Sequence, residues 1–360
     1  MSTIFSRWFQ RKFSNPQAVV LGMLLLFGFA AILLLSDILN PLFVAIVLAY
    51  LLEWVVSSIE QKSMSRLWSV VIVFLSFVAL LLTTVFIFIP LIWKQIVALG
   101  NDLPGMLKQG QERLLQLPEQ YPDFISQNQI EDVTRAITAE LGTMGQAILS
   151  ASIDSLLSVV VIAIYLILVP LLIFFLLKDK SIILEWVSSW LPKERTMANQ
   201  VWSEVNIQIG NYIRGKVAEI LIVGIATYIV FAFMGLNYAL LLSVLVGFSV
   251  LIPYIGAALV TIPVALIGYF QWGFSAEFGY LIIAYGIIQA LDGNVLVPIL
   301  FSEAVNLHPV AIISAVLLFG GIWGFWGVFF AIPLATLVKA VLNAWQEVPH
   351  DDADQSISEA

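Results

Sequence analysis

Long uninterrupted apolar runs dominate this chain, and short polar connections separate them. Most runs approach the roughly 20 residues that an α-helix needs to cross a bilayer. They show no alternation of apolar and polar positions, which is the pattern of a membrane barrel strand. Helices satisfy their own backbone hydrogen bonds in lipid. We therefore predict an all-α, polytopic membrane protein with about eight transmembrane helices, plus extramembrane amphipathic helices.

The predicted spans divide the chain into membrane and non-membrane segments. Residues 1–93 hold three spans, and Ser36-Asp37 with Asn40-Pro41 predict a tight turn between the first two. A fourth span follows at 153–177. Residues 216–345 form a Gly/Pro-rich membrane core, with runs at about 217–234, 238–252, 256–271, 279–298 and 309–345. Segments 253–271 and 309–345 are either full spans or re-entrant hairpins, and the second would break at Gly320-Gly321.

Three other segments are polar or amphipathic. Residues 94–152 carry several prolines, and apolar positions recur at helical spacing from Ile130 to Ile148, which predicts an insert with an amphipathic helix. Residues 178–215 predict two further amphipathic helices separated by Pro192. Residues 346–360 form an acidic tail that we expect to be disordered.

Composition excludes several functional classes. Hydrophobic residues make up 61% of the chain and charged residues 11%, so lipid rather than water faces most of the surface. The net charge of −8 argues against nucleic acid as a partner. The absence of cysteine and the presence of only two histidines argue against a metal site. No phosphate-binding loop motif is present, so we expect no use of ATP. No serine–histidine–acid set is recognisable, and we expect no cofactor and no enzymatic activity.

The basic residues predict the orientation, because cytoplasmic loops collect Lys and Arg. With the N-terminus inside, only Lys94, Lys108, Arg113 and Arg135 lie outside, on the 94–152 insert. Both termini are then cytoplasmic, and the insert lies on the outer face.

Polar residues inside the last membrane segments are the main candidates for chemistry. The candidates in this cluster are Gln289, Asp292, Asn294, Glu303 and His308. A carboxylate within a membrane usually has a function, so Asp292 could bind a cation or exchange a proton. The alternative is that Asp292 and Asn294 break a helix at the interface, and that Glu303 and His308 occupy a polar connection.

Two further groups complete the candidate site. Gly/Pro-interrupted segments carry Pro253, Gly256 and Pro263 in one stretch and Gly320, Gly321 and Pro333 in another, and they match each other at an offset of about 70 residues. Such paired broken helices point to a transporter binding site, although chance similarity also explains them. At the inner end of the fifth span, Arg214, Lys216 and Glu219 are either membrane anchors or a charged functional motif.

The chain resembles the autoinducer-2 exporter family of bacterial permeases, and within it the PerM-type branch. The motifs that carry the resemblance are LIPYIGA at 251–257, LHP at 307–309, FGGIWGFWG at 319–327 and AIPLA at 331–335, with FFLLKD at 174–179 and YIRGK at 212–216. The resemblance implies a multi-pass inner-membrane homo-oligomer that transports a small solute or ion without ATP.

The leading functional hypothesis is a secondary transporter for a small solute or cation, with coupling to H⁺ or Na⁺ through Asp292. One alternative is a passive channel lined by polar residues. Another is a membrane scaffold or regulator that captures a partner through the outer-face insert. An intramembrane enzyme is the least favoured, since no catalytic set of residues is recognisable.

Overall fold

The computed structural model describes residues 16–115, 155–190, 196–301 and 307–346, and within these ranges all regular structure is helical. Seven helical segments there are long and apolar enough to cross a membrane, judged by length and composition. They are Ser36–Glu60, Arg66–Gly110, Val161–Lys178, Val201–Phe233, Ile255–Trp272, Ala276–Phe301 and Pro309–Phe329. The predicted all-α polytopic fold is confirmed. The amphipathic helix expected between 128 and 148 and the tail beyond 346 lie outside the described residues.

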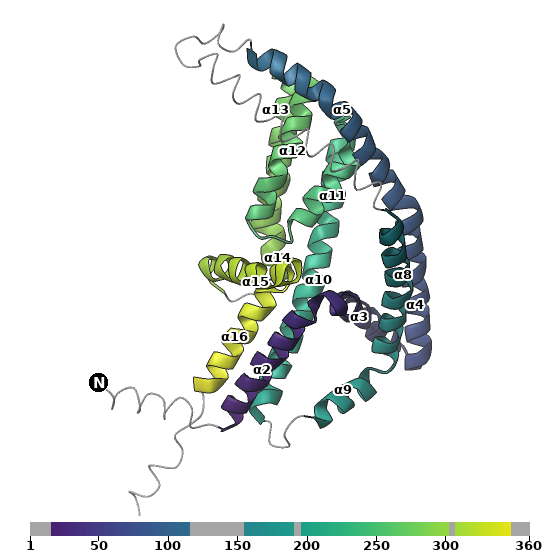
Figure 1. The fold of residues 1–360 in the computed structure, drawn as a ribbon, viewed down its shortest axis with the longest axis vertical. Helices are drawn as coiled ribbons and strands as arrows, with labels where there is room; N and C mark the ends of the chain where they lie inside the picture. The colour runs from purple at the N-terminus through teal and green to yellow at the C-terminus, as the bar shows by residue number, and fades with distance from the viewer. Residues whose placement is uncertain (1–15, 116–154, 191–195, 302–306, 347–360) are drawn as a thin grey trace, which may run out of the picture. The chain divides into compact units, whose positions relative to one another are not determined.

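Figure 1 labels the helices in chain order. Their bounds are α2 Pro16–Leu34, α3 Ser36–Glu60, α4 Arg66–Thr83, α5 Ile89–Leu115, α8 Ser155–Lys178, α9 Lys180–Ser189, α10 Thr196–Phe233, α11 Ala239–Ser249, α12 Ile255–Trp272, α13 Ala276–Leu291, α14 Val297–Phe301, α15 Pro309–Phe329 and α16 Ala331–Gln346. Two π-helical turns join neighbouring helices: η1 at Thr84–Phe88 and η2 at Asp292–Leu296.

Some boundaries differ from the sequence prediction. Of the turn predicted at Ser36-Asp37 and Asn40-Pro41, the second part is wrong, because Pro41 lies inside α3. The chain breaks around Leu35, next to Ser36-Asp37. The helix that contains the third span continues past Trp93 to Leu115. In the same way, α10 runs without interruption through residue 216. Proline and polar residues therefore sit within helices that the apolar runs alone would have ended.

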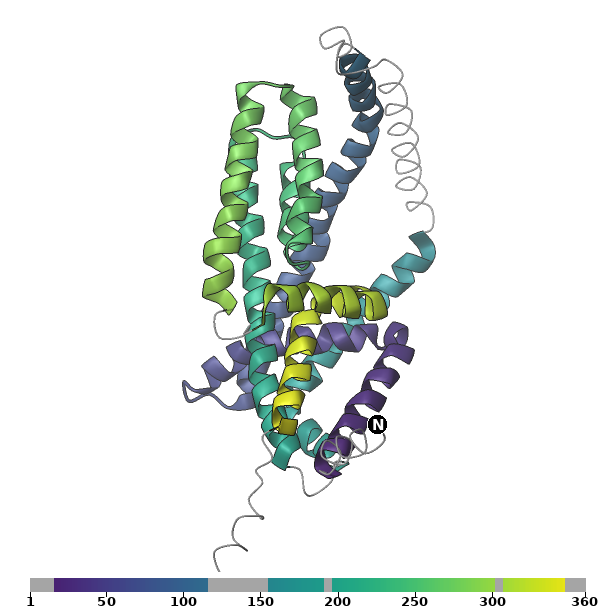
Figure 2. The ribbon, with the colours of Figure 1, turned by 90° about the vertical axis from the view of Figure 1, so that its left-hand side faces the viewer.

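The chain forms two compact units. One contains residues 1–67, 172–217 and 298–360, and the other contains 68–171 and 218–297. In the second unit, α12 packs against both α11 and α13, and the short connection after Trp272 joins α12 to α13 (Figures 1 and 2). Its apolar core includes Phe231, Leu242, Val246 and Leu281, all of which are buried.

Aromatic packing organises part of the first unit. Phe43 of α3 lies edge-on to Trp323 and Trp326 of α15, with ring centroids 5.3 and 5.7 Å apart. Trp326 donates its indole N–H to the Asn40 side-chain oxygen at 2.8 Å. Edge-to-face aromatic pairs of this kind add to the stabilisation from burial alone. The same contacts explain why the segment around Asn40-Pro41 serves as a packed helix rather than a turn.

Candidate functional site

Asp292 begins the π-helical turn η2, within a long apolar helical run from Ala276 to Phe301. The Val297 N–H donates to the Asp292 backbone oxygen five residues earlier, which is the hydrogen bond that defines a π-turn. The Asn294 amide donates to the Ala290 backbone oxygen at 2.8 Å. The structure therefore places a carboxylate and a carboxamide at an irregular turn of a membrane helix.

The surroundings of Asp292 are partly closed to solvent. Its Oδ1 atom and the side-chain nitrogen of Gln289 are both buried. Gln289, Asp292 and Asn294 thus lie along one short stretch of a single helical run, as the sequence cluster suggested. Within the described ranges, no three His, Asp or Glu side chains gather closely enough to hold a metal ion. The chemistry available at this turn is that of one carboxylate with amide neighbours.

The polar cluster in the sequence also included Glu303 and His308. Glu303 lies outside the described residues. His308 belongs to the other compact unit, where its Nδ1 accepts the Val310 N–H at 3.3 Å and caps the start of α15. A side chain that accepts a hydrogen bond from the first turn of a helix stabilises the helix terminus. The observed geometry of His308 is therefore that of a helix cap in a polar connection.

The first Gly/Pro-interrupted segment forms a sharp corner between α11 and α12. Tyr254 adopts a positive φ of 64° there, which is uncommon for a residue with a bulky side chain. Gly256 then packs directly on the end of α11, and a Cβ placed on it would lie 1.7 Å from the Ser249 backbone oxygen. Pro263 lies further along, inside α12. The corner thus depends on a close backbone approach that only glycine permits.

The second interrupted segment forms a comparable corner in the other unit. The prediction of a break at Gly320-Gly321 is wrong, because these residues are helical and the break falls at Gly324, with φ 60° and ψ −135°. A Cβ on Gly327 would lie 1.8 Å from the Phe319 backbone oxygen. The chain then turns again near Phe330 into α16, which contains Pro333 (Figures 1 and 2).

The two corners share their geometry as well as their sequence. Each has one residue with positive φ, followed two or three residues later by a glycine that packs on a backbone oxygen seven or eight residues earlier. These positions correspond at offsets of 70 and 71 residues, as the sequence comparison of the two segments indicated. The shared geometry favours an internal repeat over chance similarity.

The charged motif of α10 is more buried than a membrane anchor would be. The exposed fractions of Lys216 and Glu219 are 4% and 2%. The Lys216 ammonium lies 5.2 Å from the centre of the Phe301 ring, a cation–π distance. Arg214 is half-buried, and its guanidinium donates to the Asn211 side-chain oxygen at 2.6 Å. These residues are thus held by protein contacts.

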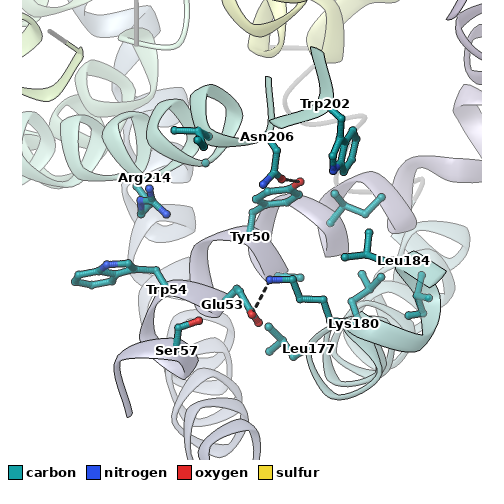
Figure 3. Close-up of a pocket in the computed structure, with 16 residues that line it drawn as sticks. Tyr50, Glu53, Trp54, Ser57, Leu177, Lys180, Leu184, Trp202, Asn206 and Arg214 are labelled. Carbon is teal, nitrogen blue, oxygen red and sulfur yellow. Dashed lines mark hydrogen bonds and ion pairs between the residues drawn. The ribbon is translucent and has the colours of Figure 1, made fainter. Parts of the chain in front are cut away.

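The first unit contains a pocket of about 520 Å³ that the sequence did not predict (Figure 3). Parts of α3, α8, α9 and α10 line it, and its walls are mainly apolar. The Tyr50 hydroxyl donates to the Asn206 side-chain oxygen at 2.6 Å across the pocket wall. Glu53, Lys180 and Arg214 supply its charged groups. Its volume falls within the range usual for small-molecule sites.

Glu53 forms ion pairs with residues of two other segments beside this pocket. Its carboxylate lies 2.9 Å from the Lys180 ammonium and 3.2 Å from the Arg66 guanidinium. Arg66 also contacts Glu60 at 3.3 Å and donates to the Leu177 backbone oxygen at 2.6 Å. The available sequence signal was one carboxylate inside the apolar run that ends near Val56. A carboxylate in such a run needs a charged or hydrogen-bonding partner, but the sequence does not identify that partner.

The chain is similar in sequence to several known proteins. Residues 21–347 match the family described as AI-2E family transporter. PerM of Escherichia coli (strain K12), named as a permease, is 51% identical over 347 residues, which cover 96% of this chain and 98% of PerM. YueF of Bacillus subtilis (strain 168), named as a transport protein, is 29% identical over 318 residues, which cover 86% of this chain and 84% of YueF. The similarity extends over nearly the whole chain.

Proposed function

Because the chain belongs to the AI-2E family of transporters, we propose that it is a secondary transporter for a small solute or ion, with coupling to H⁺ or Na⁺ through Asp292. Family membership and the seven span-forming helical segments of the described residues make it a multi-pass membrane protein of a transport family. Membership of such a family favours transport over catalysis.

The observation that carries the coupling proposal is the position of Asp292 at a π-helical turn. A carboxylate within a membrane segment costs several kcal/mol unless it is neutralised or paired, so its retention favours a function. π-Turns within α-helices occur frequently at functional sites. Protonation neutralises the carboxylate, and a bound Na⁺ compensates its charge with oxygen ligands. Either event changes the cost of moving this helix past lipid or protein, and that difference can couple ion and solute movement.

We also propose that the interrupted segments Pro253–Pro263 and Gly320–Pro333 each offer backbone polar groups to the solute. Broken membrane helices expose backbone N–H and C=O groups that bind ions and polar solutes. The family name makes an autoinducer-2-like polar solute the first class to test.

We further propose an inner-membrane homo-oligomer with both termini in the cytoplasm. The distribution of Lys and Arg supports this orientation, and the family resemblance supports the homo-oligomer.

Flux through sealed proteoliposomes tests the proposal. Internal pH is followed while Na⁺, K⁺ or H⁺ gradients are imposed, with and without the polar solute. Wild-type protein should move protons or Na⁺ in a solute-dependent manner. Asp292→Asn should abolish the coupled movement, because the amide can neither ionise nor balance a cation. Glu277→Gln, an exposed acid in the first turn of the same helical run, is the matched control and should keep the flux.

Two results would contradict the proposal. Full coupled flux in Asp292→Asn, from protein that elutes as wild type in size exclusion, would remove the role of this carboxylate. Steady single-channel currents in planar bilayers, independent of any coupling ion, would identify a passive channel instead.

A further inference from the structure

The pocket between α3, α8, α9 and α10 carries one more positive than negative charge. Among its lining residues, Glu53 is the anion and Lys180 and Arg214 are the cations. The Glu53 carboxylate is 2.9 Å from Lys180, and Arg66 contacts it from outside the lining. Within the part of the chain that the structure describes, the hydrogen-bond partner of Arg214 is the neutral Asn211 amide. No carboxylate among the described residues pairs with Arg214, so its charge can attract an anion.

A glycine of the same helix leaves space for the Arg214 side chain. The guanidinium lies over Gly210, one turn earlier on α10, since a Cβ at Gly210 would be 3.6 Å from an Arg214 nitrogen. Both residues line the pocket, and Figure 3 shows Arg214 and Trp54 on one side of Glu53 with Lys180 on the other. A guanidinium presents paired N–H groups whose geometry matches a phosphate or carboxylate.

The residues around the pocket are those expected at a membrane–water boundary. The short helix α9 exposes Trp186, and the residue that follows the helix is Trp190; their exposed fractions are 62% and 76%. Trp54 and Trp202, both in the pocket lining, are 60% and 55% exposed. Tryptophans concentrate at the headgroup level of bilayers, and short amphipathic helices lie in that plane. These residues favour a position of the pocket at the depth of lipid headgroups.

The remaining walls suit an acyl chain rather than a fully polar solute. Ile46, Leu177, Leu184 and Ile207 provide apolar surface next to the charged groups. This combination of a cation whose partner among the described residues is neutral, interfacial tryptophans and an apolar wall matches a ligand with an anionic head and an apolar tail. Basic pockets between membrane helices on the cytoplasmic side are known to bind anionic lipid headgroups.

We propose that this pocket is a binding site for an anionic phospholipid. The phosphate accepts hydrogen bonds from Arg214, the polar head contacts Asn206 and Ser57, and the first part of the acyl chains lies along the apolar wall. The proposal is independent of Asp292, which belongs to the other compact unit.

The test uses the purified full-length protein, stripped of lipid in mild detergent. Native mass spectrometry follows titration with dihexanoyl phosphatidylglycerol, and dihexanoyl phosphatidylcholine and glycerol 3-phosphate serve as comparators. We expect saturable binding of the phosphatidylglycerol, and a loss of affinity of about tenfold or more in Arg214→Gln, because a charge-assisted hydrogen bond is lost. Lys62→Gln removes an exposed cation of the α3–α4 connection, outside the pocket, and should change the affinity less than about twofold.

A second variant guards against misfolding of Arg214→Gln. Ser57→Asp adds a negative charge to the pocket wall with little change in volume, and it should weaken phosphatidylglycerol binding without altering the helical circular dichroism spectrum. Wild-type affinity in Ser57→Asp would overturn the proposal. So would equal losses in Arg214→Gln and Lys62→Gln, or equal binding of phosphatidylcholine. Glycerol 3-phosphate binding as tightly as phosphatidylglycerol would show a soluble phosphate site instead and would also overturn it.

Discussion

The corner between α11 and α12 predicts opposite effects for the same substitution at two glycines. Gly256→Ala places a methyl group 1.7 Å from the Ser249 backbone oxygen. Gly279→Ala, in α13 of the same compact unit, meets no atom within 4 Å. The chemical change is identical, so the difference between the two variants isolates the close backbone contact.

The magnitude follows from the distance. Carbon–oxygen contacts in proteins are seldom closer than about 3.3 Å, so the corner must open by roughly 1.6 Å. That movement disturbs the Ser249 oxygen, which accepts the Ile252 N–H at 3.1 Å, and the Gly256 N–H, which donates to the Ile252 oxygen at 2.9 Å. Overpacking of this severity costs about 3 kcal/mol or more. Gly279→Ala should instead stabilise the protein by about 0.5–1 kcal/mol, because alanine is the better helix former.

Thermal unfolding of the purified protein in one detergent measures both effects. Using the usual conversion for chains of a few hundred residues, Gly256→Ala should lower the Tm by about 6–12 °C. Gly279→Ala should raise it by about 1–4 °C. An unchanged Tm in Gly256→Ala, or equal losses in both variants, would refute the inference that backbone contact fixes this corner.

The hydrogen bonds of Gln271 and the ion pairs of Glu53 give two further predictions. Gln271 accepts the Asn237 N–H at 2.7 Å and donates to the Gly235 oxygen at 2.8 Å, so Gln271→Ala should cost about 1–2 kcal/mol, measured as a fall in Tm. Glu53→Gln leaves two cations with a neutral partner and should cost about 1–3 kcal/mol, whereas Glu60→Gln, at a more exposed pair, should cost less than about 1 kcal/mol. Equal costs in the two glutamate variants, from denaturation in the same detergent, would contradict this ranking.

The sequence predicted the membrane helices well where apolar runs were continuous. The run that became α8 begins and ends within two residues of its prediction, and α12 is equally close, because apolar length alone determines a membrane span. Helix ends in polar segments were harder to place. The segment after Trp93 carries many polar side chains, yet the helix continues to Leu115, since an amphipathic face can extend a helix beyond the membrane.

The positions of breaks depend on backbone angles that residue types do not specify. Gly320, Gly321 and Gly324 all permit a break, and only Gly324 adopts a non-helical conformation. In the same way, Pro41 lies inside a helix, because a membrane helix tolerates proline where neighbouring groups compensate for its missing N–H.

The candidate site was predicted in part. The grouping of Gln289, Asp292 and Asn294 followed from their spacing, but the π-turn that holds them did not. The pocket was missed because its walls come from residues more than 100 positions apart, such as Glu53 and Lys180. Contacts at that separation arise from tertiary packing and leave no local pattern in one sequence.

The π-turn at Asp292–Leu296 makes this site sensitive to chain length as well as to residue type. A π-turn accommodates one residue more than an α-helical turn does, and each residue of an α-helix rotates the chain by about 100°. Deletion of Gly293 alone would therefore restore a regular helix, keep the flanking segments nearly in phase, and remove the five-residue hydrogen bond to the Asp292 backbone oxygen. A homologue that keeps the carboxylate but lacks this one residue would hold it on a regular helix, so the alignment gap, and not the identity of the acid, would mark the loss of the π-turn.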